Sequence, residues 1–248
     1  MPTAYHRLNP LTKMTVAAAG SVAALAVGGY VVPLAVAAAM LLGASVAHLA
    51  GRLLGLSLLV SLPIAVSVVL VSVFTRVGTT VLFSIGPFDA TLQGADFAGQ
   101  TLVRLLAIAL SVGLFSTTTD PRALVADLER RGAPPRLAFV ALATVEAVPT
   151  LAERARVIAE AQRARGLDTE GGLVARARGL LPIVGPAILS SLTDVEERSL
   201  ALETRGFTRP GRRELLWSVP DSARQTFARR LLLATLVVLV AAHAARLV

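Results

Sequence analysis

Residues 14–50 read MTVAAAGSVAALAVGGYVVPLAVAAAMLLGASVAHLA, a run of 37 residues in which His48 is the only side chain able to carry a charge. A bilayer core is about 30 Å thick and takes roughly 20 helical residues to cross. The run is therefore long enough for two membrane helices, and a Gly-Gly pair followed by Pro33 near its middle offers a turn between them. We expect one helix over 14–30 and a second over 31–50.

Further apolar runs predict three more membrane helices, over 53–74, 101–115 and 231–245, with Arg104 near the start of the 101–115 helix. The whole chain of 248 residues is 54% hydrophobic and 16% charged, whereas a soluble domain carries about 25% charged residues. The first apolar run is too long for a cleaved secretory signal, so we expect it to be retained as an anchor. The sequence predicts an all-α, multi-span helical membrane protein.

The number of membrane helices stays open at two places. Residues 137–151 are apolar but include Glu146, and residues 179–192 are short and contain two prolines. Each stretch is compatible with a membrane helix or with a helix that lies at the membrane interface.

The distribution of Lys and Arg predicts which side of the membrane each loop occupies. Residues 120–230 hold 18 of the 24 basic residues, whereas the 77–100 connection holds none. Because cytoplasmic loops retain basic residues, we expect a plasma-membrane protein with its N-terminus and its basic region inside and the 77–100 connection outside. We accordingly divide the chain into an N-terminal membrane part (1–118), a cytoplasmic coupling module (119–228) and a C-terminal span (229–248).

The cytoplasmic region is predicted to contain three amphipathic helices. The first, over 120–131, begins at an Asp-Pro pair and is ended by Gly132 and two prolines. The other two, over 150–165 and 187–205, space their apolar residues three and four apart. The 18 basic and 14 acidic side chains of 120–230 nearly balance, which argues against a nucleic-acid surface and favours a membrane face or a protein partner.

The two longer cytoplasmic helices end alike. The first ends in Ala164-Arg165-Gly166, and the second ends in Thr204-Arg205-Gly206. Such ends are common for structural reasons alone, because Gly adopts positive φ past a helix end and Arg complements the helix dipole. Two of them in one cytoplasmic region also fit a paired device, in which each guanidinium binds carboxylates or carbonyls of a partner protein. The pattern by itself leaves both interpretations open.

Several kinds of chemistry are excluded or disfavoured by the residues themselves. The chain has no Cys, so it offers no zinc-thiolate site, iron–sulfur cluster or Cys nucleophile, and its three His residues are far apart in sequence. Its single Lys, Lys13, is followed by Met14, whereas a P-loop needs Lys-Ser or Lys-Thr. We expect no catalytic residue, no metal and no cofactor, and we expect any ATP that the system uses to be bound by another polypeptide.

At these residues the chain resembles the transmembrane coupling (T) component of energy-coupling-factor (ECF) transporters, the CbiQ/EcfT family. The resemblance covers nearly the whole chain and rests on Asn9-Pro10-Leu11-Thr12-Lys13, the Thr-Thr-Asp-Pro of 118–121 and Glu129-Arg130-Arg131-Gly132-Ala133-Pro134. Its most specific part is the Ala-Glu-Ala-Gln-Arg-Ala-Arg-Gly of 159–166, followed by the second Arg-Gly end, where Thr204 stands in place of the family's frequent Ala.

The resemblance implies a non-catalytic subunit of an ABC-type importer for a vitamin or a transition-metal ion. It implies that Arg165 seats on one of two cytoplasmic ATP-binding-cassette ATPases and Arg205 on the other. It also implies that the apolar faces of the amphipathic helices support a separate substrate-binding membrane protein, the S component, which receives the ATP-driven motion. The expected ATPase-docking residues are Ala164, Arg165, Gly166, Thr204, Arg205 and Gly206.

Two other classes of function remain alternatives. A stand-alone secondary transporter or permease places ionisable groups inside its spans, and Arg104 is the candidate here. A membrane-embedded enzyme needs a catalytic cluster near the lipid boundary, and Glu146 is the best candidate, although no His lies near it in the sequence. As a structural residue, Glu146 is instead expected to pair with an Arg on a neighbouring helix.

Overall fold

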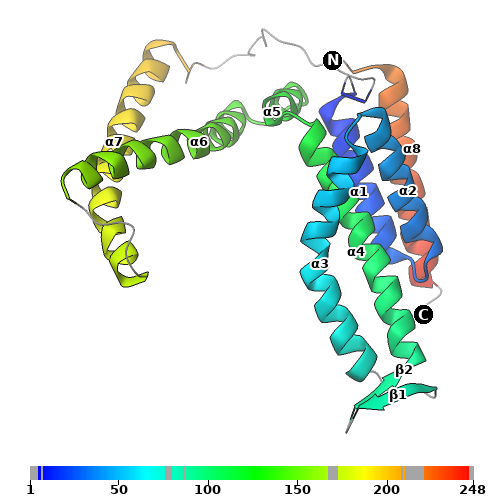
Figure 1. The fold of residues 1–248 in the computed structure, drawn as a ribbon. Coiled ribbons are helices and arrows are strands. Elements are labelled where there is room, and N and C mark those ends of the chain that lie inside the picture. The colour runs from blue at the N-terminus through cyan, green and yellow to red at the C-terminus, as the bar shows by residue number, and fades with distance from the viewer. Residues whose placement is uncertain are drawn as a thin grey trace. The chain divides into compact units, whose positions relative to one another are not determined.

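The computed structural model describes residues 5–6, 8–75, 80–85, 88–166, 173–207, 209 and 221–245. The elements in chain order are α1 (Pro10–Ala26), α2 (Val31–Val46), α3 (Ala50–Thr75), β1 (Val81–Ile85), β2 (Phe88–Thr91), α4 (Leu92–Thr118), α5 (Pro121–Arg130), α6 (Pro135–Ala164), α7 (Leu173–Thr204) and α8 (Ala223–Ala245) (Figure 1). The chain divides into two compact units: unit 1 is Met1–Asp127 with Ser218–Val248, and unit 2 is Leu128–Trp217. The all-α, multi-span prediction is confirmed, with one short hairpin added.

The first helix begins one turn earlier than its apolar run predicted. Asn9 caps α1, because its side-chain Oδ1 accepts a hydrogen bond from the Leu11 N–H at 2.9 Å, and Pro10 takes the first helical position. The helix ends at Ala26, and Gly29, with φ +85°, lies in the turn before α2. The predicted turn at the Gly-Gly pair is confirmed. The predicted start at residue 14 is wrong because the capping residues lie in the polar stretch before the apolar run.

Helix α4 is the centre of unit 1 and packs against α1, α2 and α3 (Figure 1). Their shared core consists of small and medium apolar side chains: Ala24, Ala37, Met40, Ala44, Leu53, Ala107, Leu110 and Leu114. Small residues let membrane helices approach closely, which matters where lipid removes the hydrophobic drive for helix association. A Cβ added at Gly113 of α4 would lie only 2.7 Å from Leu53 Cδ1 of α3, so a larger residue there requires the Leu53 side chain to shift.

Helix α4 is also longer than predicted, beginning at Leu92 rather than at residue 101. Thr91 caps it, because the Thr91 Oγ1 accepts a hydrogen bond from the Gly94 N–H at 3.2 Å. The first turns carry polar side chains, so the hydropathy signal begins later than the helix does. Arg104 consequently lies near the middle of α4 and not near the start of a span, which corrects the prediction.

The 77–100 connection holds a β-hairpin that the sequence did not predict. Strands β1 and β2 pair antiparallel, from Val81 opposite Thr91 to Ile85 opposite Phe88, with an irregular register between Val81 and Phe83. Strands this short carry too few alternating residues to stand out in the sequence.

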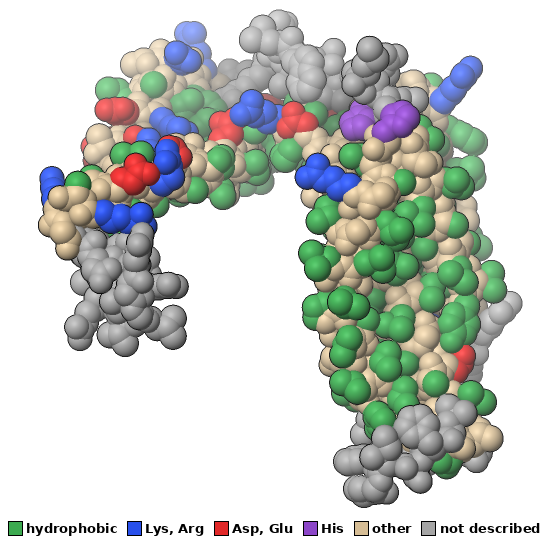
Figure 2. Space-filling view, in the orientation of Figure 1, with side chains coloured by type: hydrophobic (Ala, Val, Ile, Leu, Met, Phe, Trp, Pro, Cys, Tyr) green, Lys and Arg blue, Asp and Glu red, His purple; other side chains and the backbone are tan. Residues whose placement is uncertain are grey.

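Four of the described helices are long and apolar enough to cross a membrane: Ala50–Phe74, Leu92–Thr118, Pro135–Ala164 and Ala223–His243. Helices α1 and α2 are apolar but shorter. Large apolar side chains stand exposed on α3 and α8, among them Leu59 and Val237, each about two thirds exposed, and Figure 2 shows hydrophobic side chains covering this face of unit 1. Because soluble monomers rarely expose apolar surface on this scale, these faces suit contact with lipid.

Unit 2 is built mainly from two long helices. The undecided stretches 137–151 and 179–192 are the N-terminal parts of α6 and α7, and the helices predicted over 150–165 and 187–205 are their C-terminal parts. Pro149 lies inside α6, and Pro182 and Pro186 lie inside α7. Proline disfavours a helix interior, but α6 and α7 begin well before the predicted starts at 150 and 187 and continue through these prolines. Helix α5 (Pro121–Arg130) matches the predicted 120–131 helix closely.

Candidate functional site

Helices α6 and α7 pack against each other in opposite directions. Near the end of α6, Gln162 Nε2 donates a hydrogen bond to the carbonyl oxygen of Pro182, near the start of α7, at 3.5 Å. Near the start of α6, the ring of Phe139 meets the ring of Phe207, just past the end of α7, edge-on with centroids 5.0 Å apart. Each helix therefore ends beside the beginning of the other.

An ion pair joins the middle of the two helices. Arg154 of α6 pairs with Asp194 of α7, and Arg154 Nη1 also donates to the Ser190 Oγ at 3.3 Å. The sequence placed both charged residues on amphipathic helices but did not pair them. Several acidic residues follow one another near Asp194, so the helical pattern alone could not say which of them faces α6.

The first Arg-Gly end is an ordered helix terminus. Ala164 is the last residue of α6 and Arg165 is its C-cap. The Gly166 N–H donates to the Arg163 carbonyl at 2.9 Å, and Gly166 has φ +89°, a left-handed conformation that favours glycine. The Arg165 side chain is exposed to solvent. The guanidinium is thus presented at a helix tip whose backbone turns sharply immediately after it.

The second Arg-Gly end has the same geometry. Gly206 has φ +70°, its N–H donates to the Glu203 carbonyl at 2.9 Å, and the Phe207 N–H reaches back to the Leu202 carbonyl at 2.9 Å. These two bonds form a Schellman motif, in which glycine at the left-handed position satisfies the last helical carbonyls. Arg205 is exposed, and the Thr204 hydroxyl donates to the Ala201 carbonyl at 3.0 Å. Thr204 is therefore accommodated in the last turn of α7, where the family often has Ala.

The antiparallel packing places the two tips at opposite ends of the helix pair. The contacts at Phe139 and Gln162 are 23 residues apart on α6, so at about 1.5 Å per helical residue the tips lie roughly 35 Å apart. A single small ligand cannot bridge that distance. The arrangement therefore fits two separate binding events, each at an exposed arginine on a fixed helix end.

A third helix, α5, ends in the same way, at the Gly132 that the sequence predicted as its end. At the end of α5, Gly132 has φ +106°, the Gly132 N–H donates to the Glu129 carbonyl at 3.0 Å, and the Ala133 N–H donates to the Leu128 carbonyl at 3.1 Å. Arg131 precedes this glycine and is exposed. The Arg-Gly motif is thus a general helix terminator in this chain, and its conformation alone does not define a docking site.

A groove of about 410 Å³ lies between α6 and α7. Its walls are mostly apolar and include Phe139, Val140, Leu151, Val195 and Leu202. Because apolar side chains are exposed along it, the pair presents a surface suited to another helix or to lipid.

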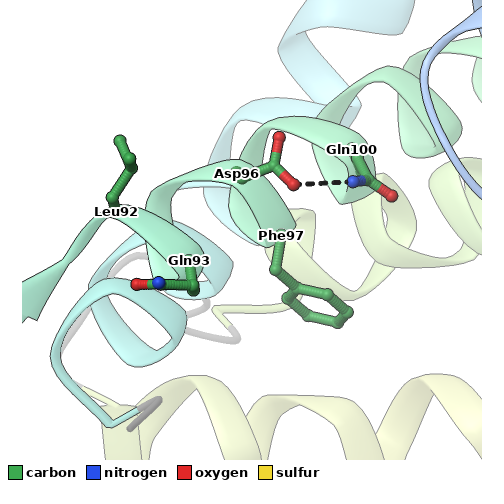
Figure 3. A pocket seen from close by; sticks show the side chains of 5 residues that line it. All are labelled: Leu92, Gln93, Asp96, Phe97 and Gln100. Atoms are coloured by element: carbon green, nitrogen blue, oxygen red, sulfur yellow. Dashed lines mark hydrogen bonds between the residues drawn. The ribbon is translucent and has the colours of Figure 1, made fainter. Parts of the chain in front are cut away.

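A second, polar depression of about 520 Å³ lies at the start of α4, lined by Leu92, Gln93, Asp96, Phe97 and Gln100 (Figure 3). Gln100 Nε2 donates to an Asp96 carboxylate oxygen at 2.8 Å, and the Tyr30 hydroxyl donates to the other at 2.9 Å. The hydrogen bond to Asp96 raises the pKa of the Tyr30 phenol. The contacts tie the α1–α2 turn to the start of α4.

Arg104 is the candidate residue for a secondary transporter. Its Nη2 donates to the Val27 carbonyl at the end of α1 at 3.5 Å, and its Nε is buried without a hydrogen-bond partner. Within the described ranges, no three His, Cys, Asp or Glu side chains lie close enough together to hold a metal ion. The expected pairing of Glu146 with an Arg stays a prediction.

Comparison with known proteins identifies the family. A family model described as CbiQ, cobalt transport protein, matches residues 2–215 of this chain. The chain belongs to the CbiQ family. The match includes both Arg-Gly ends and all of α1 to α7, whereas α8 lies beyond the matched residues.

Several relatives of this CbiQ-family chain are named energy-coupling factor transporter transmembrane protein EcfT. The one from Thermosediminibacter oceani is 28% identical over 214 residues, which is 81% of this chain and 78% of that protein. The one from Brevibacillus brevis is 36% identical over 148 residues, which is 56% of each protein. A putative ABC transporter ATP-binding protein of Bifidobacterium longum is 32% identical over 221 residues, covering 81% of this chain but 27% of that protein.

Proposed function

We propose that this chain is the transmembrane coupling component of an ECF-type ABC importer, transmitting ATP-driven motion from two cytoplasmic ATPases to a substrate-binding S component. The observation that carries the proposal is the pair of exposed arginines at opposite ends of α6 and α7, each on a glycine-terminated helix tip. Membership of the CbiQ family and the names of the EcfT relatives indicate that this pair acts in an energy-coupling factor transporter.

Each tip has the chemistry to bind an ATPase. Arg165 and Arg205 offer planar guanidinium groups that donate several hydrogen bonds in a fixed fork, suited to carboxylates and carbonyls in a protein groove. Ala164 and Thr204 complete the last helical turn before each arginine, and Gly166 and Gly206 turn the backbone away behind it. We assign all six residues to ATPase docking.

The Bifidobacterium relative supports an ATPase partner, because it is a longer protein that contains a segment similar to this chain. This chain corresponds to 27% of that protein, which leaves 73% of its length (100 − 27) outside the match, and the protein is named an ATP-binding protein. In that organism a segment similar to this chain therefore shares a polypeptide with a part to which the name assigns ATP binding. Segments that are fused in one protein are often separate proteins that interact in other organisms.

The apolar groove between α6 and α7 supports the proposed contact with the S component, to which the motion is transmitted. The apolar side chains in its lining suit a membrane-embedded helical partner, which would respond when the two helices move. We assign this surface to the S component. Coupling requires that the two nucleotide states of the ATPases hold α6 and α7 differently, because a ligand shifts an equilibrium only through differential affinity.

We place the chain in the plasma membrane, with its N-terminus and residues 119–228 on the cytoplasmic side, on the grounds of the basic-residue distribution. The chain itself is assigned no catalytic step, and ATP hydrolysis is assigned to the partner ATPases. The cargo is a vitamin or a transition-metal ion recognised by the S component.

The proposal is tested by co-expressing an affinity-tagged chain with two ABC-type ATPases and an S component from the same organism. We expect both ATPases to copurify with the chain and the purified chain alone to hydrolyse no ATP. Replacing both Arg165 and Arg205 with Ala should reduce the copurified ATPase at least tenfold. The matched control is Arg131→Ala, which removes an exposed arginine from the same Arg-Gly geometry at the end of α5.

Two results would contradict the assignment. If the Arg165→Ala/Arg205→Ala variant retains its ATPases and the control behaves the same way, the tips do not dock. If the chain reconstituted alone in liposomes carries cobalt, nickel or biotin without ATP, it is a secondary transporter.

A further inference from the structure

A buried polar cluster lies within unit 1, and neither the tips nor the groove uses it. The chain enters unit 2 within α5, after Asp127, and returns to unit 1 at Ser218, before α8. Side chains from the start of α1 and the start of α8 form the cluster, which consists of Asn9, Thr12, Lys13, Asp221, Gln225 and Arg229.

Arg229 of α8 is the centre of this α1–α8 cluster and is 6% exposed. Its guanidinium binds Asp221, the first described residue before α8, through two bonds of 3.1 and 2.8 Å. Nη1 also donates to the Thr12 Oγ1 at 2.9 Å and to the Asn9 Oδ1 at 3.4 Å. One side chain therefore joins the chain returning from unit 2 to the first turn of α1.

Gln225 adds a second link between the same two helices. Its Oε1 accepts hydrogen bonds from the Asn9 N–H at 2.9 Å and from the Thr12 hydroxyl at 3.3 Å. The Asn9 N–H precedes the first turn of α1 and has no intrahelical partner, so a side chain from α8 satisfies it. The start of α8 thus contributes to the cap of α1.

Lys13 links α1 to the end of α4. Its side chain is buried, and its Nζ donates to the carbonyl of Thr118, the last residue of α4, at 2.7 Å and to the His6 carbonyl at 3.2 Å. A cation at this position complements the partial negative charge of the α4 C-terminus. Helix α5 begins at Pro121, three residues later, and the chain passes into unit 2 only after Asp127, so Lys13 holds the end of α4 within unit 1.

Burying a lysine and an arginine is costly, and apolar residues would hold helices together with less desolvation. What the charged groups add is a defined position for the atoms that they bind, because every bond fixes both distance and direction. Here the bound atoms belong to Thr118, at the end of α4, and to Asp221, before α8. The start of α1 is therefore the common anchor of these two parts of unit 1, one before and one after unit 2 in the chain.

We propose that Lys13 and Arg229 are positioning residues of the coupling mechanism: they hold the end of α4 and the start of α8 to the first turn of α1, so that a movement imposed by the ATPases shifts these three helices together. This rests on the proposed coupling function. Without the cluster, the end of α4 and the start of α8 would move separately when the ATPases change state.

The test measures the distance between the end of α4 and the start of α8 in the complex with the ATPases. Because the chain has no cysteine, the replacements Thr117→Cys and Arg224→Cys introduce the only spin-label sites in the chain, both at exposed positions of unit 1. The distance between the labels is measured by double electron–electron resonance without nucleotide and with ATP plus vanadate. With the cluster intact, we expect the same distance distribution in both states.

In the Arg229→Gln background we expect the copurified ATPase to stay within twofold of the parent level and the label distance to become nucleotide-dependent, with a shift or at least a doubling of the width on adding ATP and vanadate. The matched control, Arg230→Gln, removes the neighbouring exposed arginine and should leave both states alike. A merely structural role would change the distribution equally in both states. That result, or no change in either state, overturns the proposal.

A milder variant guards against misfolding of Arg229→Gln. Gln225→Leu removes two hydrogen bonds to α1 but keeps both charged residues, and a smaller nucleotide-dependent change is expected. A nucleotide-independent distance in this variant also overturns the proposal. Failure of the parent chain to bind the ATPases is a separate result, which refutes the coupling function itself.

Discussion

Arg154 of α6 forms an ion pair with Asp194 of α7, and the two side chains are 29% and 31% exposed. Contacts at both ends of the helices lie on either side of this pair, between Gln162 and Pro182 and between Phe139 and Phe207. The pair therefore fixes which turns of α6 and α7 face each other midway between the tips. That register decides where each tip lies relative to the other.

Removing this ion pair should weaken unit 2 only modestly. Both partners reach solvent, so Arg154→Ala is expected to cost less than about 1 kcal/mol. Arg154→Asp, which sets two acids against each other, should lower the apparent melting temperature further, and Arg154→Asp combined with Asp194→Arg should recover most of the loss. The measurement is thermal unfolding of the four variants as a double-mutant cycle. A cycle with no coupling energy would mean that the two charges do not interact in solution.

The two docking arginines should act independently. Tips separated by roughly 35 Å share no contacts, and distant substitutions usually add in free energy. Arg165→Ala is expected to raise the dissociation constant of one ATPase site and Arg205→Ala that of the other, and the double variant should weaken each site by the same factor as the corresponding single variant. Titration of labelled ATPase onto the chain in nanodiscs measures this. If either single variant already abolishes all binding, the two tips act as one site.

The conformation at each tip predicts an order of effects for substitutions at Gly166. An L-residue other than Asn or Asp costs about 1–2 kcal/mol in the left-handed region, and space is not limiting, because nothing lies within 4 Å of a Cβ there. ATPase affinity should therefore fall in the order Gly166, Gly166→Asn, Gly166→Ala. Gly185→Ala, in the interior of α7 with equally open surroundings, is the control and should not weaken binding. Equal affinities across the series would show that the turn is not needed.

Two glycines near the α3–α4 interface should respond oppositely to the same substitution. A Cβ at Gly94 would overlap the Ser72 carbonyl oxygen and lie 3.0 Å from the Val73 Cα. Because this backbone cannot move aside easily, Gly94→Ala should cost about 1–3 kcal/mol. Gly55 lies within α3 with nothing within 4 Å of its Cβ position, so Gly55→Ala should be neutral or stabilising by up to about 1 kcal/mol. Melting temperatures in one detergent compare the two variants, and a destabilised Gly55→Ala with an unchanged Gly94→Ala would contradict the packing.

His48 offers a stabilising substitution. It has φ +57°, and the hydrogen bonds from the His48 N–H to the Ser45 carbonyl and from the Leu49 N–H to the Ala44 carbonyl complete a Schellman end to α2. Gly adopts this conformation without the steric cost of a Cβ, so His48→Gly should raise the free energy of unfolding by about 1 kcal/mol. Thermal unfolding checks the sign. A lower melting temperature would mean that the exposed imidazole makes a stabilising contact.

The sequence alone identified the class of fold and the positions of the candidate site. Long uncharged runs require a membrane or a large buried core, and few other environments satisfy so many consecutive apolar side chains. The two Arg-Gly ends could be found because helix termination is a local property, set by glycine's access to positive φ within one turn. Both features depend on residues that are close together in the chain.

The sequence failed where distant residues decide the outcome. The predicted helices began at 150 and 187, directly after Pro149 and Pro186, whereas α6 and α7 continue through both prolines. Asp194 could not be chosen as the partner of Arg154 among several neighbouring acids. The polar first turns of α4 and the hairpin before it also gave no clear signal.

Only the tertiary structure showed that α6 and α7 run in opposite directions, which places Arg165 and Arg205 at opposite ends of the pair. Only the tertiary structure brought Arg229 to the first turn of α1, across 217 residues of chain from Thr12. The physical reason is the same in both cases. Helix ends follow from local backbone preferences, whereas the choice of partner between helices depends on which side chains can pack and exchange hydrogen bonds once the whole chain has folded.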